Sequence, residues 1–195
     1  MVMSLLNTQS HYLKDVAAMV AIRNSQHRIH SMSLIHKKLY QSDNVISINM
    51  DIYIQELIEY FKLSFDTGQR IRFVANIEAV EMDTSQAVPL GLIINEAITN
   101  SIKHAFPDNR EGTISVSLQK VSHTHFKLVI SDNGIGMPNG LEKRNFTSLG
   151  MRLIKGLSDD LDAKLAIENN NGLSISIEFA YDEKILNATI NELSA

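Results

Sequence analysis

The chain has 195 residues, of which 44% are hydrophobic and 21% are charged, and its formal net charge is −4. These values are typical of a globular protein with one sizeable core, and the acidic balance gives no reason to expect a nucleic acid or an anionic membrane as partner. Because there is no cysteine, disulfides, thiolate metal sites and cysteine nucleophiles are excluded. No apolar run approaches the roughly 20 residues that span a bilayer, and no signal peptide is evident, so we expect no direct membrane contact from this segment.

The first 41 residues contain no glycine or proline and predict helices throughout. We expect a short helix, MSLLNTQSHYL, and a long one, VAAMVAIRNSQHRIHSMSLIHKKLYQ, with Asp15 as the N-cap or turn residue between them. Apolar residues recur along the long segment at three-, four- and seven-residue steps: Met19, Ile22, Ile29, Met32, Ile35 and Leu39. This stripe needs a partner, and two hairpins that dimerise into a four-helix bundle would bury it.

From Ile46 the pattern changes to a mixture of helices and strands. The predicted helices cover 50–65, 84–106 and 151–161, and the second of them begins with Thr84 or Ser85 as its cap. The predicted strands lie within 69–78, 113–121, 126–132, 164–169 and 173–181, and a long loop with four glycines covers 133–150. These elements predict a layer of helices on a mostly antiparallel sheet, which is an α+β sandwich.

The segment NEAITNSIKHAF carries an acid, an amide and a cation at i, i+4 and i+7, which are Glu96, Asn100 and Lys103. On a helix these positions share one narrow sector beside the apolar face. The spacing alone favours an ordinary solvated face. The alternative is a nucleotide–magnesium site, in which Asn100 is a Mg²⁺ ligand, Lys103 pairs with a phosphate and Glu96 acts as a base.

The segment LVISDNGIGM places Asp132 at the end of a strand, before Gly134 and Gly136. These glycines open a long loop instead of a tight turn, and loops of this length are usually functional or mobile. A buried carboxylate needs a hydrogen-bond donor, and the exocyclic amine of adenine is a suitable one. In TSLGMRLIKGL, the residues Thr147, Ser148 and Gly150 stand at a helix start, where free N–H groups form an anion site; Ser148 as a simple N-cap explains the pattern equally well.

Taken in this order, the segments resemble the ATP-binding domain shared by sensor histidine kinases, type II topoisomerases, heat-shock chaperones and mismatch-repair ATPases, the GHKL superfamily. NEAITNSIKHAF is similar to the N box of that family, DNGIGM to its first glycine box and SLGMRLI to its second. The resemblance implies a two-layer α/β sandwich of the Bergerat type, preceded by an α-helical hairpin. It divides the chain into a partial dimerisation hairpin (1–43), an ATP-binding catalytic domain (44–182) and a C-terminal tail (183–195).

By this resemblance, Asp132 reads adenine, Asn100 binds Mg²⁺ and Glu96 is the catalytic acid or base. The remaining residues implied to bind ATP are Lys103, His104, Gly134, Gly136, Met137, Thr147, Ser148, Leu149 and Gly150. The segment PNGLEKRNF would be a lid over ATP, with Lys143 and Arg144 near the phosphates. Ser148 replaces a family glycine, and Gly172-Leu173 replaces the usual Gly-Thr, so a hydroxyl beside the adenine would be missing or supplied by Ser174.

The N-terminal segments resemble the dimerisation module of one histidine-kinase subgroup, whose phosphoacceptor histidine lies in an HRVKNN-type stretch before the SLLN segment. The sequence has no such stretch, so we expect the acceptor helix to be truncated and the chain to lack its own acceptor. We expect the histidines of this region at surface or bundle positions: His11, His27, His30 and His36.

The resemblance therefore implies a fragment of an ATP-dependent protein-histidine kinase that uses Mg·ATP and passes the phosphoryl group to a response-regulator receiver domain. It also implies a homodimer through the N-terminal helices and a cytoplasmic location, either in a soluble protein or in the cytoplasmic part of a membrane-anchored sensor. Two alternatives stay open. One is a degenerate ATP-binding module that regulates or dimerises without transfer, and the other is a GHKL ATPase or serine kinase.

Overall fold

The structure is a computed structural model, which describes residues 15–41, 47–65, 67–68, 70–137, 148–169 and 171–181. Its elements in chain order are α2 (Val16–Gln41), β1 (Ser47–Asn49), α3 (Met50–Ser64), β2 (Ile71–Ile77), β3 (Glu81–Asp83), α4 (Thr84–Asn100), the π-helix η1 (Ser101–Ala105), the 3-10 helix η2 (Pro107–Asn109), β4 (Gly112–Ser122), β5 (His125–Asp132), α5 (Leu149–Asp160), β6 (Lys164–Asn169) and β7 (Leu173–Ala180). The short predicted helix before Asp15 and the tail after Tyr181 lie outside the described residues.

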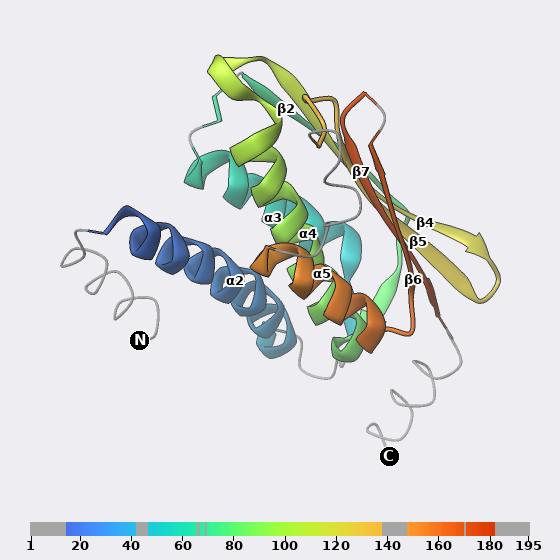
Figure 1. The fold of residues 1–195 in the computed structure, drawn as a ribbon. Helices are drawn as coiled ribbons and strands as arrows, with labels where there is room; N and C mark the ends of the chain where they lie inside the picture. Colours follow the sequence, from blue (N-terminus) through green and yellow to red (C-terminus); the bar gives the residue numbers. More distant parts are fainter. Residues whose placement is uncertain are drawn as a thin grey trace.

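The main sheet has the strand order β2-β4-β5-β7-β6. Only the β2–β4 pair is parallel, and the other neighbours are antiparallel, so the predicted, mostly antiparallel sheet is confirmed. The helices α3, α4 and α5 lie together on one face of it (Figure 1). A second, two-stranded sheet of β1 and β3 was not predicted, because strands this short carry almost no periodic signal.

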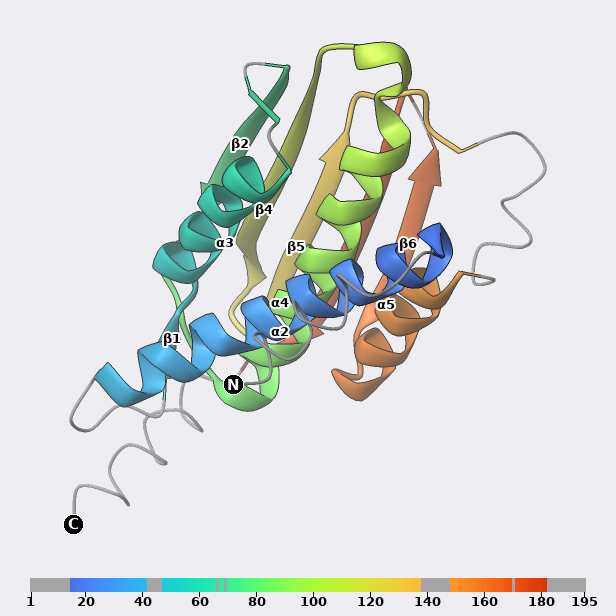
Figure 2. The same cartoon turned by 90° about the vertical axis from the view of Figure 1, so that its left-hand side faces the viewer.

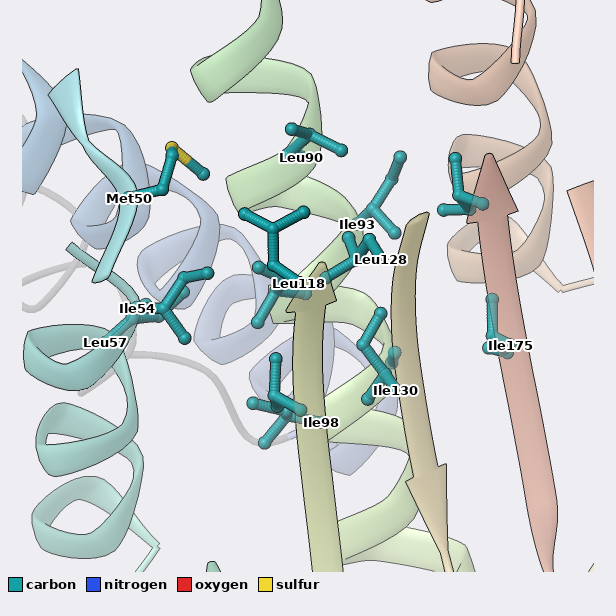
Figure 3. Packing of buried hydrophobic residues seen from close by; sticks show 14 of the residues in the cluster. Met50, Ile54, Leu57, Leu90, Ile93, Ile98, Leu118, Leu128, Ile130 and Ile175 are labelled. Carbon is teal, nitrogen blue, oxygen red and sulfur yellow. The ribbon is translucent and has the colours of Figure 1, made fainter. Parts of the chain in front are cut away.

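The core lies between the helix layer and the sheet. In β5 burial alternates strictly from His125 to Asp132, which is the signature of a strand with one face covered. Leucine and isoleucine side chains of α4 meet those of β4 and β5 in Figure 3 (Leu90, Ile93 and Ile98; Leu118, Leu128 and Ile130). Every residue of α4 from Leu90 to Thr99 is buried, so this part of the helix is enclosed on all sides. Polar groups in such a position are usually hydrogen-bonded, as those of Asn95 and Glu96 are, whereas the Thr99 hydroxyl has no partner among the described residues.

The two helix starts that the sequence suggested have different outcomes. Asp15 does cap α2, because its carboxylate accepts a hydrogen bond from the Ala17 N–H at 2.8 Å. The predicted cap of α4, Thr84 or Ser85, is wrong. Asp83 takes that place, since it ends β3 with an extended backbone and its carboxylate accepts from the Gln86 N–H at 3.1 Å.

Helix α2 lies across α4 on the side away from the sheet (Figures 1 and 2). The face that it buries is not the predicted apolar stripe, because Met19 and Met32 stay 38% and 47% exposed. Of the six stripe residues, Ile35 is buried, Ile22 and Ile29 are half-buried, and the side chain of Leu39 lies outside the description.

The buried face of α2 is more polar than the predicted stripe. Its members His27, Ser31 and Ile35 follow one another at four-residue steps. Asn95 of α4 donates through its amide to the His27 carbonyl at 2.9 Å and to the Ser31 hydroxyl at 2.8 Å. The partner that covers this face is therefore the α/β domain of the same chain.

His27 is 4% exposed, which corrects its expected surface or bundle position. Its Nδ1 is 2.8 Å from the Tyr60 hydroxyl and its ring stacks on Phe65, whereas its Nε2 has no hydrogen-bond partner within the described part of the chain. Burial lowers the pKa of His27 to about 4, and the positive charges of Lys103, Arg23 and His30 add to the effect.

This lowered pKa predicts an acid-sensitive fold. Because the folded pKa of His27 lies below the ordinary value of 6.5, its contribution to stability is complete above pH 6.5 and is lost as the pH falls toward 4. At pH 5 we expect a loss of about 2 kcal/mol in the free energy of unfolding relative to pH 7.5. Urea denaturation of the wild type and of His27→Phe at both pH values measures it, and an equal pH dependence in the two proteins would contradict it.

Candidate functional site

Helix α4 does not continue as a regular helix through the stretch that carries the acid, the amide and the cation. It ends at Asn100, and Ser101–Ala105 form the π-helix η1, a type of turn that is frequent at functional sites. Glu96 is buried and Asn100 is half-buried, whereas Lys103 and His104 are exposed. Lys103 nevertheless stays on the side of Glu96, because it donates to Asn24 of α2, the helix whose Arg28 binds Glu96.

Glu96 and Asn100 face the first turn of α5. A Cβ atom added to Gly150 would lie 2.7 Å from the Glu96 carboxylate and 3.6 Å from the Asn100 amide nitrogen. A side chain at this position would therefore require the Glu96 carboxylate to shift. The structure brings these three predicted residues together, although they come from two separate sequence motifs.

The helix start that leads into Gly150 has an ordinary cap. The Ser148 hydroxyl accepts from the Met151 N–H at 3.3 Å, so the N-cap interpretation of Ser148 is confirmed. Leu149 is 67% exposed. Thr147 lies outside the described residues, and so does the predicted lid with Lys143 and Arg144.

Asp132 is 9% exposed at the end of β5, and both oxygens of its carboxylate accept hydrogen bonds. Oδ1 accepts from the Gly134 N–H at 3.0 Å and from the Leu173 N–H at 3.3 Å, and Oδ2 accepts from the Ser101 hydroxyl at 2.7 Å. The prediction that this carboxylate must be hydrogen-bonded is confirmed. Its protein donors come from η1, the glycine turn and β7.

The glycine turn after Asp132 packs directly on η1. The Ile135 N–H donates to the Ala105 carbonyl at 3.0 Å, and a Cβ on Gly134 would lie 2.3 Å from that same oxygen. Gly136 has φ +69°, which favours glycine. The first glycine motif therefore lies against the end of the helix that carries Asn100.

Asn169, the last residue of β6, holds the next residue of this turn. Its side-chain oxygen accepts from the Met137 N–H at 2.8 Å, and its amide nitrogen donates to the Met137 carbonyl at 2.9 Å. Sequence reasoning missed Asn169, which stands at a strand end with no local motif. Its double hydrogen bond fixes the loop where the predicted lid begins.

Helix α2 pairs with the candidate acid of this site. The Arg28 guanidinium donates to both oxygens of Glu96, at 2.6 and 2.9 Å, and the side chains are 20% and 7% exposed. The hydrogen bond to Glu96 raises the pKa of Arg28 above its ordinary value. Lys103 donates to Asn24 of the same helix, and burial lowers the pKa of its amine. Arg28 and Asn24 were not predicted, because nothing in the sequence of α2 indicates which residues of α4 they meet.

Comparison with known proteins agrees with this arrangement. Residues 66–179 match the family model described as histidine kinase-like ATPase domain, and residues 1–65 match the one described as histidine kinase. The chain belongs to the histidine kinase-like ATPase family. It is 28% identical over 172 residues to the sensor histidine kinase PdtaS of Mycobacterium tuberculosis, covering 86% of this chain and 34% of that protein.

Blue-light-activated histidine kinase 2 of Erythrobacter litoralis is 20% identical over 193 residues, which are 89% of this chain and 55% of that protein. The chain thus spans about a third to a half of the length of these relatives. Among solved structures, the histidine kinase domain of an Erythrobacter litoralis blue-light activated histidine kinase aligns with a TM-score of 0.73 and 20% identity, covering 98% of this chain and 95% of that one. The predicted fold, a helical region followed by an α/β sandwich, is confirmed.

Within this histidine kinase-like domain, the available side-chain ligands suit a metal ion that is shared with the nucleotide, and not one held by protein side chains alone. The described residues contain no group of three or more His, Asp or Glu that could hold an ion. The Asn100 side-chain oxygen, next to Gly150, would be a neutral ligand, which fits Mg²⁺ that takes its other ligands from phosphates and water. No helix among the described residues is long and apolar enough to cross a membrane.

The Arg28–Glu96 pair gives a stability prediction. Arg28→Ala leaves the Glu96 carboxylate buried without its cation, so we expect a loss of about 3 kcal/mol in the free energy of unfolding. The double variant Arg28→Ala/Glu96→Gln removes the unpaired charge and should lose less. Urea denaturation measures both, with Lys37→Ala, an exposed cation on the same helix, as control. A single variant no less stable than that control would contradict the prediction.

Proposed function

We propose that this chain is the ATP-binding catalytic part of a two-component sensor kinase. It transfers the γ-phosphoryl group of Mg·ATP to a histidine nitrogen, from which the group passes to the aspartate of a response-regulator receiver domain. The observation that carries the proposal is the convergence of three motifs on the end of α4. Gly150 lies against Glu96 and Asn100. The hydroxyl of Ser101, the residue after Asn100, donates a hydrogen bond to Asp132.

The proposed roles follow from the chemistry of each group. Asp132 accepts a hydrogen bond from the exocyclic amine of adenine, and Asn100 contributes an oxygen ligand to Mg²⁺. Lys103 and His104 lie at the exposed end of the same helix, where phosphates would extend. Phosphoryl transfer depends mainly on positioning and on neutralisation of charge, so these residues act by holding the nucleotide in place.

Glu96 is the proposed acid or base, and its surroundings set a condition on its use. Both of its oxygens accept from Arg28, so a histidine acceptor would have to share the carboxylate with the guanidinium or displace it. Movement of Arg28 and α2 away from Glu96 would free the acid for transfer. The same observation favours the alternative function, an ATP-binding module in which the acid stays engaged and no transfer occurs.

The acceptor is proposed to come from outside the described helices. The sequence has no HRVKNN-type stretch, and His27 is buried with its Nδ1 beside the Tyr60 hydroxyl. We therefore infer that a histidine outside the described helices accepts the phosphoryl group, in a homodimer formed through the N-terminal helices. A cytoplasmic location is proposed with it, because ATP and receiver domains are found there.

Nucleotide titration tests the binding roles. We expect Asp132→Ala to weaken ATP binding at least about tenfold, with or without Mg²⁺, because a hydrogen bond to a charged group is lost. We expect Asn100→Ala to weaken binding only when Mg²⁺ is present. Isothermal titration with ATP in Mg²⁺ and in EDTA measures both, with Asp160→Ala, an exposed carboxylate on α5, as control. Unchanged affinity in the Asp132 variant would show that the base is not read there.

Incubation with γ-labelled ATP tests the acceptor. We expect the chain to bind the nucleotide and yet to acquire no acid-labile phosphate, since it lacks the acceptor motif. Phosphate analysis by acid and alkali treatment after gel separation measures this. A label that is lost in acid and kept in alkali, on any histidine of this chain, would overturn the proposal of a separate acceptor.

A further inference from the structure

Resting on the proposed ATP site, the inference concerns the hydroxyl that stands beside Asp132. The family pattern implies such a hydroxyl before the last strand, where this chain has Leu173, and Ser174 was the sequence-based candidate to replace it. The structure excludes Ser174. Ser174 is the cross-strand partner of Ser131, so the two side chains lie on the same face of the sheet. Asp132 lies on the opposite face, the one that also carries the buried Ile130. Because neighbouring residues in a strand point to opposite faces, Ser174 lies on the face away from Asp132.

Ser101 supplies the hydroxyl instead. It is 6% exposed, and its Oγ is 2.7 Å from Asp132 Oδ2. A carboxylate only accepts hydrogen bonds, so the single proton of this hydroxyl is directed at Oδ2. The lone pairs of the hydroxyl then remain for a donor on the nucleotide or for a bridging water.

Backbone donors alone do not fix this carboxylate. Gly134 and Leu173 both donate to Oδ1, and Gly172, with φ +126°, allows that approach because a Cβ there would lie 1.9 Å from the Asp132 carbonyl. Among the described residues Ser101 is the donor to Oδ2. Without it the oxygen that faces η1 would have no protein partner to hold its orientation.

The position of Ser101 links this contact to the metal ligand. It follows Asn100 directly, and successive residues on a helix point about 100° apart. Asn100 therefore faces Gly150 of α5 while Ser101 faces the end of β5. Two consecutive residues thus lie at opposite ends of the proposed nucleotide site, Asn100 at the phosphate end and Ser101 at the base end.

We propose that Ser101 is a positioning residue for nucleotide specificity: it orients Asp132 for the exocyclic amine of adenine and thereby sets the preference for ATP over GTP. Guanine presents a carbonyl where adenine presents the amine. At that position it offers the carboxylate no donor, so guanine placed in the orientation of adenine gains nothing from Ser101.

Titration of ATP and GTP against the wild type and four variants tests this. Ser101→Ala should weaken ATP binding roughly tenfold, leave GTP binding unchanged and so reduce the ATP/GTP ratio of affinities by the same factor. Ser101→Thr keeps the hydroxyl and should restore the ratio. Ser174→Ala, on the opposite face of the sheet, should behave as the wild type. Ser101→Cys, whose thiol is a weak donor, should give an intermediate ratio and replaces Ser101→Ala if that variant does not fold.

An unchanged ATP/GTP ratio in Ser101→Ala or Ser101→Cys, with ATP binding intact, overturns the role of Ser101 and leaves the proposed function standing. Equal loss of ATP and GTP affinity also overturns it, because that result marks a merely structural role. A wild type that binds no ATP overturns the proposed function itself, so the two failures are distinguishable.

Discussion

The carboxylate of Asp132 is the constraint around which the site is arranged. A carboxylate buried at the edge of a core is tolerated only when its oxygens are hydrogen-bonded. Here the donors come from η1, from the turn after β5 and from the start of β7, so satisfying one side chain fixes three segments relative to each other. The group proposed to read the base is therefore oriented before any nucleotide arrives, and binding does not have to supply the free energy of ordering it.

Helix α4 joins this arrangement to the rest of the molecule. Its apolar residues fill the space above the sheet, and the same turns carry Glu96 and Asn100 toward α5. An acid in so enclosed a helix needs a cation, and Arg28 of α2 provides it with two hydrogen bonds. The position of α2 is consequently tied to the charge of the residue proposed for catalysis.

The sequence predicted those features that depend on local pattern. Periodicity placed the five strands of the main sheet and the helices, and the ordered motifs pointed to Glu96, Asn100, Asp132 and the glycines that meet them. Contacts between distant segments carry no local signal. Arg28 and Glu96 are 68 positions apart, and Ser101 and Asp132 are 31 apart. The polar face that α2 packs on α4 was not predicted for the same reason, because its hydrogen bonds with Asn95 join distant segments. Burial of the apolar stripe between two hairpins stays a prediction.

The contacts of Asp132 and the contacts of α2 involve different parts of the proposed reaction, namely binding of the base and transfer of the phosphoryl group. The three donors to Asp132 found among the described residues belong to the α/β domain, so the proposed reading of the base does not depend on where α2 lies. In contrast, Asn95, Glu96 and Lys103 each bond to α2. A shift of α2 would therefore break the Arg28–Glu96 pair while leaving the proposed contact between Asp132 and adenine intact. A kinase that keeps its nucleotide and answers to a signal needs that separation, and here it follows from which face of α4 each partner covers.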